Sequence, residues 1–344
     1  MDNKNNNNIT GKAAELISKS GPLVALILLC IFLAFKNENF FTSTNLLNVA
    51  RQAALNGFLS LGMMVCILTA GIDLSIGYTM TLSTIIMAKC AVEAGVNPVL
   101  CLLIGILTGG LLGLVNGLLL TKCKLPHPFI STLGTQNIYK GIGLVITGAT
   151  PIAGMPAVVK WAGSAFLSSN QDSFLGKIPL SFVIMLIVYA LFSVFLNYTT
   201  LGRHIYAVGG NINTAGLSGI NVDFVRTSVY VISGVMAALG GIMLTGRTDS
   251  AYPLSGNLLE NDAIAAVIIG GTSFFGGKGN VLGTFTGVLL IAVLRNGLNL
   301  LNVSSDMQTI FLGGIIIVAV FIDVVRGGGF KRVKRMKKEE KAAV

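Results

Sequence analysis

Charged side chains are scarce in this sequence. Only 11% of its 344 residues are Asp, Glu, Lys or Arg, whereas 53% are hydrophobic, and the mean hydropathy is +0.78. Soluble domains carry about 25% charged residues, so this chain has too few to cover a water-exposed surface. The apolar residues form runs close to the ~20 residues that cross a bilayer as a helix. They do not alternate with polar residues, which excludes a transmembrane barrel. We therefore predict an all-α polytopic membrane protein.

Residues that catalyse reactions or bind metals are also few. The two histidines, His127 and His204, lie far apart, and the sequence has neither an HExxH nor a GxSxG motif. The cysteine count is odd and includes no CxxC pair, which favours small buried hydrophobes over disulfides or metal ligands. We expect no catalytic residue and no metal site. The cysteines are Cys30, Cys66, Cys90, Cys101 and Cys123.

A phosphate-binding loop is nearly present but incomplete. The motif needs a glycine, four residues, and then Gly-Lys-Ser/Thr, so that amides and the lysine cradle phosphate. The nearest stretch has Thr272 where the first glycine should be and Gly279 where Ser or Thr should be. We therefore expect this chain to bind no cofactor itself, and to bind no ATP.

Ten apolar runs predict ten transmembrane helices, which together form one domain over residues 21–325. An Asn-rich, flexible tail (residues 1–20) precedes this domain, and a basic tail (residues 326–344) follows it. The predicted helices lie near 21–35, 53–70, 77–94, 98–121, 128–148, 179–197, 227–246, 260–276, 281–301 and 306–325.

The distribution of basic residues sets the predicted orientation. If the N-terminus is cytoplasmic, sixteen Lys and Arg fall in cytoplasmic segments and five in outside segments. The positive-inside rule then favours ten spans with both termini in the cytoplasm. The net charge of +10 is concentrated in the C-terminal tail. We interpret this tail as an anchor near anionic membrane lipid and not as a nucleic-acid site.

Polar side chains within spans are costly and are therefore candidates for function. Most are neutral amides, which suit a path for a neutral, hydroxyl-rich solute, although hydrogen bonding between helices explains each of them equally well. Asp73 and Asp262 lie near predicted helix ends, where they would face headgroups or cap helices. With no carboxylate predicted at the midplane, an ion-coupled carrier is disfavoured. The candidate path residues are Asn56, Asp73, Asn116, Gln136, Asn137, Asn296 and Asn299.

The loop at residues 198–226 is predicted to lie on the cytoplasmic side. It contains a short helix near 211–218, with Asn211 available as its N-terminal cap and Gly219 at its end. A cytoplasmic partner protein could bind such a helix. A simple interfacial connector is the alternative.

Several stretches together resemble the permease subunits of bacterial ABC importers for monosaccharides, the ribose/xylose/arabinose/galactoside group. The closest likeness is to the ribose-type permease. These stretches are LTAGIDLSIG (68–77), PFISTLG (128–134), LGRHIYAVGGN (201–211) with LSGI (217–220), DAIAAVIIGGTS (262–273) with GGKG (276–279), and NGLNLL (296–301). Family members often carry another residue at His127, so His127 is given no role.

The resemblance implies the ten-helix permease fold of the vitamin B12-importer type, in a bacterial cytoplasmic (inner) membrane. Two permease copies would pair around a central path. Cytoplasmic ABC ATPase subunits, which bind the ATP and Mg, would dock on the 198–226 loop. A periplasmic or lipid-anchored sugar-binding protein would deliver the solute. The residues implied in coupling are Arg203, Gly210, Asn211, Ala215, Ser218 and Gly219.

Other functions stay open on sequence alone. A permease of the same superfamily could carry autoinducer-2, a nucleoside or a branched-chain amino acid. A carboxylate-bearing solute would be expected to require helix N-termini or a charged side chain. A stand-alone secondary carrier or channel, or a membrane scaffold, would lack the coupling loop.

Overall fold

The computed structural model describes residues 21–168 and 177–326, so the predicted tails lie outside the described residues, apart from Arg326. In this part of the chain there are thirteen α-helices, namely Gly21–Lys36 and those labelled α2 to α13. The bounds are α2 Ser43–Leu68, α3 Ile76–Ala88, α4 Pro98–Thr121, α5 Pro128–Thr147, α6 Ala157–Ser164, α7 Leu180–Tyr198, α8 Thr200–Gly210, α9 Ile212–Leu217, α10 Val222–Thr248, α11 Leu259–Ile269, α12 Val281–Leu300 and α13 Ser305–Arg326. The strands are β1 Ile152–Ala153 and β2 Ser250–Ala251, paired antiparallel.

The predicted all-α class is confirmed, and each predicted span has a helix as its counterpart. Among the described residues, six helices are long and apolar enough to cross a membrane: α2, α4, α7, α10, α12 and α13. The helices that correspond to the other four predicted spans are either shorter or less apolar than this. The first helix, α3 and α11 are shorter, and α5 has 20 residues but carries more polar side chains.

Three predicted boundaries are wrong by several residues. The helix placed at 53–70 begins at Ser43, where Thr42 accepts a hydrogen bond from the Asn45 amide and caps it. The helix placed at 227–246 begins at Val222, where Asn221 caps it. The helix placed at 260–276 ends at Ile269, because the backbone turns through Gly271 with φ +89°.

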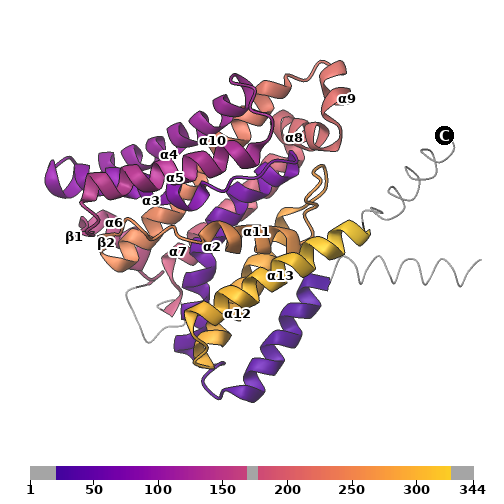
Figure 1. The fold of residues 1–344 in the computed structure, drawn as a ribbon. Helices are drawn as coiled ribbons and strands as arrows, with labels where there is room; N and C mark the ends of the chain where they lie inside the picture. The colour runs from indigo at the N-terminus through magenta and orange to yellow at the C-terminus, as the bar shows by residue number, and fades with distance from the viewer. Residues whose placement is uncertain (1–20, 169–176, 327–344) are drawn as a thin grey trace, which may run out of the picture.

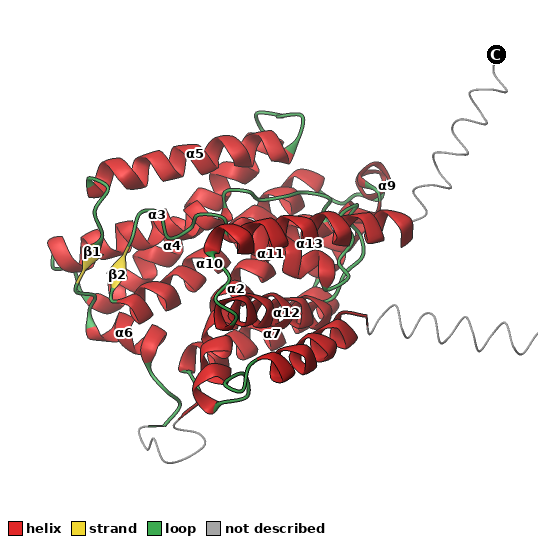
Figure 2. Cartoon of the chain, turned by 60° about the horizontal axis from the view of Figure 1, so that its bottom comes forward, coloured by secondary structure: helices red, strands yellow, loops and turns green. Residues whose placement is uncertain are grey.

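The helices run between two ends of the molecule (Figure 1). One end carries α8 and α9, and we call it the α8–α9 end. The opposite end, the strand end, carries α6 and the β1–β2 pair (Figures 1 and 2). At the strand end Asp249 Oδ2 accepts a 2.8 Å bond from Lys160 Nζ, and its Oδ1 accepts one from the Met155 amide. The bond from Lys160 holds the pKa of Asp249 below its ordinary value of 3.8.

The two most buried long helices, α2 and α10, form the centre of the bundle. Helix α4 packs along α10 through glycines that have no side chain to separate the backbones. A Cβ at Gly113 would overlap the Tyr230 carbonyl, and one at Gly109 would overlap the Gly234 carbonyl. The glycine spacing in the sequence is therefore explained by close approach of two helices.

The short helices α3 and α11 begin next to each other. A Cβ at Gly77, in the first turn of α3, would overlap the carbonyl of Gly256, three residues before α11 begins. Just before α3, Asp73 accepts a hydrogen bond from Ser233 near the middle of α10. The two helix N-termini thus meet inside the bundle. Acidic residues lie at both N-termini, where a carboxylate is favoured by the helix dipole.

Candidate functional site

Two of the predicted path residues, Asp73 and Asn116, belong to one buried network. Asp73 is 1% exposed, and its carboxylate accepts hydrogen bonds from Ser75 and Ser233 at 2.7 Å each. Asn116 of α4 donates to Ser75 Oγ at 2.7 Å and accepts from Thr135 of α5 at 2.6 Å. This network ties α3, α4, α5 and α10 together around the N-terminus of α3.

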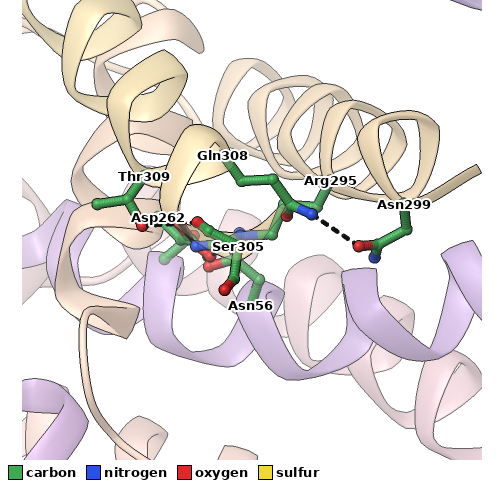
Figure 3. A network of polar contacts seen from close by, with 8 residues as sticks. Asn56, Asp262, Arg295, Asn299, Ser305, Gln308 and Thr309 are labelled. Carbon is green, nitrogen blue, oxygen red and sulfur yellow. Dashed lines mark hydrogen bonds and ion pairs between the residues drawn. The ribbon is translucent and has the colours of Figure 1, made fainter. Parts of the chain in front are cut away.

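The expectation that the span carboxylates face headgroups is wrong. Asp262 is 3% exposed and forms a two-pronged ion pair with Arg295 of α12, at 2.6 and 2.7 Å. Figure 3 shows this pair together with Asn56 of α2. Asn56 is 8% exposed, and its Nδ2 has no hydrogen-bond partner among the described residues. The argument that disfavoured an ion-coupled carrier therefore fails, although Arg295 neutralises Asp262.

Two further predicted path residues hold α12 to its neighbours. Asn296 exchanges two hydrogen bonds with Asn45 of α2, at 2.7 and 2.9 Å. Asn299 is exposed and accepts a 2.8 Å bond from Gln308 of α13 (Figure 3). These two amides are used as hydrogen bonds between helices and lie apart from the network around Asp73.

The remaining two predicted path residues lie on α5. Gln136 donates a 3.0 Å hydrogen bond to Glu260 in the first turn of α11. Asn137 is exposed and donates only to the Leu133 carbonyl of its own helix. Glu260 was not predicted from the sequence, since its hydrogen-bond partner Gln136 lies 124 positions away.

The predicted coupling loop contains two helices instead of one. The short helix expected near 211–218 is present as α9, with Asn211 Oδ1 accepting from the Thr214 amide at 3.0 Å and Gly219 at φ +83° after its end. The preceding helix α8 was not predicted. Thr199 caps it, and its polar residues, including Arg203, alternate with buried ones.

Helix α8 is held against two turns by backbone contacts, and we call this contact the glycine junction. A Cβ at Gly209 would overlap the Leu68 carbonyl oxygen and lie 2.6 Å from the amide nitrogen of Gly277. That amide donates to the same Leu68 carbonyl at 2.9 Å. A second bond, from the Tyr206 hydroxyl to the Gly279 carbonyl at 3.0 Å, lies beside it. The junction joins α8 to the end of α2 and to the turn between α11 and α12.

The outer side of the α8–α9 loop is exposed. Leu217 is 91% exposed at the end of α9, and Phe224 is 61% exposed at the start of α10. Of the predicted coupling residues, Ala215 is buried, whereas the others are exposed: Arg203, Gly210, Asn211, Ser218 and Gly219. Single exposed apolar side chains are common on protein surfaces. What marks this loop for a partner is its attachment to the bundle through the glycine junction.

A family model described as "Branched-chain amino acid transport system / permease component" matches residues 45–320. The ribose import permease protein RbsC of Bacillus subtilis is 42% identical over 308 residues, which is 90% of this chain and 93% of that protein. The D-allose transport system permease protein AlsC of Escherichia coli is 42% identical over 301 residues, 87% and 89% of the two chains. The fructose import permease protein FrcC of Rhizobium meliloti is 35% identical over 308 residues, 88% and 84%.

No solved structure matches this chain. The family match covers most of the chain and includes every network described above as well as the α8–α9 loop. The chain therefore belongs to this family of permease components, the membrane transport subunits of ABC importers, and is not itself an enzyme.

Proposed function

We propose that this chain forms the translocation path of an ATP-driven importer for a monosaccharide, ribose being the first choice. The observation that carries the proposal is the glycine junction. It links an exposed loop, suited to a partner, with the two turns that precede α3 and α12. The identity to ribose, allose and fructose permeases supports a sugar as the solute.

In this proposal the α8–α9 loop is where an ATPase subunit docks. Leu217 and the exposed coupling residues Arg203, Asn211 and Ser218 form the contact surface. Because α8 is rigidly seated on Leu68 and Gly277, a movement of the loop must move the ends of α2 and α12 with it. The helices then shift as near-rigid bodies, and the path opens alternately to each side. ATP and Mg stay on the partner, and this chain binds no cofactor.

The proposed topology has ten spans, with both termini cytoplasmic and a fold of the vitamin B12-importer type in the bacterial inner membrane. The two ends of the structure support it. Leu68, Gly209 and Gly277, which all fall on the cytoplasmic side in this topology, meet at one end. Ile152 and Ala251, which fall outside, pair in the β-strands. Residues 21–325 form the permease domain, and residues 1–20 and 326–344 are its cytoplasmic tails.

The assembly proposed contains two copies of this chain around the path, two ATPase subunits and a sugar-binding protein on the outer side. Support for the second copy comes from α5, which packs on α3 and α4 through one face and leaves the other uncovered. The amides at Asn56, Asn116, Gln136, Asn137, Asn296 and Asn299, together with Asp73, are proposed to line the path or to hold the helices around it.

The test is to assemble the permease with its ATPase in nanodiscs and add the binding protein with different solutes. ATPase activity should rise with binding protein loaded with ribose. If leucine supports the rise and ribose, allose and fructose do not, the solute class is wrong. If the ATPase neither co-purifies with the permease nor responds to it, the importer itself is refuted.

A further inference from the structure

The exposed side of α5 carries a polar residue near its middle, among apolar side chains such as Leu133, Ile138 and Val145. Asn137 lies near the middle of this helix and is exposed, and Gln136 and Lys140 are half-buried beside it. The opposite face is buried against α3 and α4. Polar and charged groups at the middle of a span are costly in hydrocarbon, so they face water, solute or another protein surface.

The chain segment that leads into α11 reaches α5 through Glu260, and it exposes Asn257 beside the apolar Leu254 and Leu258. Asn257 is exposed and accepts a 3.3 Å hydrogen bond from the hydroxyl of Tyr78. Lys140 Nζ lies 5.6 Å from the centre of the Tyr78 ring. A 3.0 Å hydrogen bond from Gln136 to Glu260 joins α5 to the start of α11. We call this contact the α5–α11 seam. Its members are Tyr78, Gln136, Lys140, Asn257 and Glu260, and the exposed Asn137 lies next to Gln136 on α5.

Glu260 is the buried acceptor of the seam. Glu260 is 6% exposed. Gln136 donates to its Oε1 atom, whereas Oε2 has no hydrogen-bond partner among the described residues. Burying a carboxylate oxygen without a donor is costly. This oxygen lies against α3, since a Cβ added at Gly77 would be 3.2 Å from it, so a hydroxyl could donate to it only after the surrounding helices move apart.

The seam contains one basic and one acidic residue, Lys140 and Glu260. Its other members are the amide of Gln136 on α5, the amide of Asn257 before α11 and the ring of Tyr78. Such a set offers hydrogen-bond donors, hydrogen-bond acceptors and an aromatic ring, with equal numbers of basic and acidic residues. It matches a neutral solute with many hydroxyls better than an anion, which would require an excess of positive charge.

We propose that the α5–α11 seam is the closed constriction of the path, and that a neutral, hydroxyl-rich solute bonds to Glu260 and Gln136 when the seam opens. This inference rests on the proposed function and deepens it by naming the contact residues. Opening separates α5 from α11 and exchanges the Gln136–Glu260 bond for bonds to solute hydroxyls. The seam thereby acts as both gate and solute site.

The first arm of the test measures water access. The five native cysteines are replaced, and Asn137→Cys is treated with a charged methanethiosulfonate reagent in the assembled transporter. The matched control is Leu191→Cys, since Leu191 is 64% exposed near the middle of α7 on an apolar face. A thiol in lipid stays neutral and unreactive, so we expect Asn137→Cys to react at least about tenfold faster.

The second arm measures the solute. Ribose with binding protein should slow the labelling of Asn137→Cys, and Glu260→Gln or Gln136→Leu should lower the sugar moved per ATP by about fivefold, the effect of one lost hydrogen bond. Asn197→Leu serves as control, because Asn197 is exposed on α7 and, like Asn137, bonds only to its own helix.

The outcomes separate the two proposals. If the wild-type assembly shows no ATP-dependent sugar uptake, the proposed function fails. If it transports sugar but Asn137→Cys labels no faster than Leu191→Cys, the seam does not face the path. If labelling is fast but unaffected by ribose, and both seam variants transport as the wild type does, the seam is not a solute site. Protection by leucine alone would overturn the solute class.

Discussion

Substituting Gly209 with alanine tests whether the glycine junction transmits movement. The added Cβ would overlap the Leu68 carbonyl and lie 2.6 Å from the Gly277 nitrogen, whereas ordinary contact begins at 3.4 Å. The α8 helix must therefore move away by at least about 0.8 Å, the difference between these two distances. Overpacking of this kind costs about 1–3 kcal/mol. Stretching the 2.9 Å bond from Gly277 to Leu68 adds about 1–3 kcal/mol if the amide is left unpaired.

We expect Gly209→Ala to lower the Tm of the purified permease and to reduce the sugar transported per ATP hydrolysed. ATPase activity should persist, because the substitution removes no side chain of the exposed docking surface. Gly210→Ala is the control for stability, since a Cβ at the next position meets nothing within 4 Å. A Gly209→Ala protein with the Tm and transport of the wild type would refute the reasoning.

Three other perturbations follow from the contacts. Arg295→Met should destabilise the permease by about 3 kcal/mol, because it leaves the buried charge of Asp262 unpaired. The further substitution Asp262→Leu should restore much of this stability. Denaturant titration of the single and double variants measures both changes. Gly113→Leu should separate α4 from α10 and prevent accumulation of folded protein, which gel filtration in detergent would reveal. The pKa of Asp249 is lowered by Lys160, so the stabilisation is present above the ordinary pKa of 3.8 and is lost as the pH falls through the lowered value. The Tm difference between wild type and Asp249→Asn should therefore shrink in acid, and a difference that does not change with pH would contradict this.

Helices could be predicted from the sequence because long apolar runs in a membrane leave no other way to satisfy the backbone. Helix α9 was predictable for a local reason, since Asn211 and Gly219 mark its two ends. The amphipathic helix α8 was missed, because its buried residues pack on turns that are distant in the sequence.

The candidate site was less predictable than the fold. Asp73 looked like a residue at a helix end, yet Ser233 of α10 covers it and the chain re-enters the bundle there. Glu260 drew no attention, because helices from elsewhere in the chain bury it: α3 approaches it at Gly77, and α5 supplies Gln136 as its partner. Burial of a carboxylate depends on helices that pack from elsewhere in the chain, and spacing along the sequence does not record it.

Uptake of radiolabelled ribose into proteoliposomes tests the central claim most directly. The vesicle membrane contains this permease with its ATPase. ATP is supplied on one side of the membrane and the binding protein on the other. We predict uptake only when ATPase, ATP and binding protein are all present, with no effect of a proton ionophore. Uptake that persists without the ATPase, or that follows an imposed proton gradient, would contradict the claim that this chain is the gate of an ATP-driven importer.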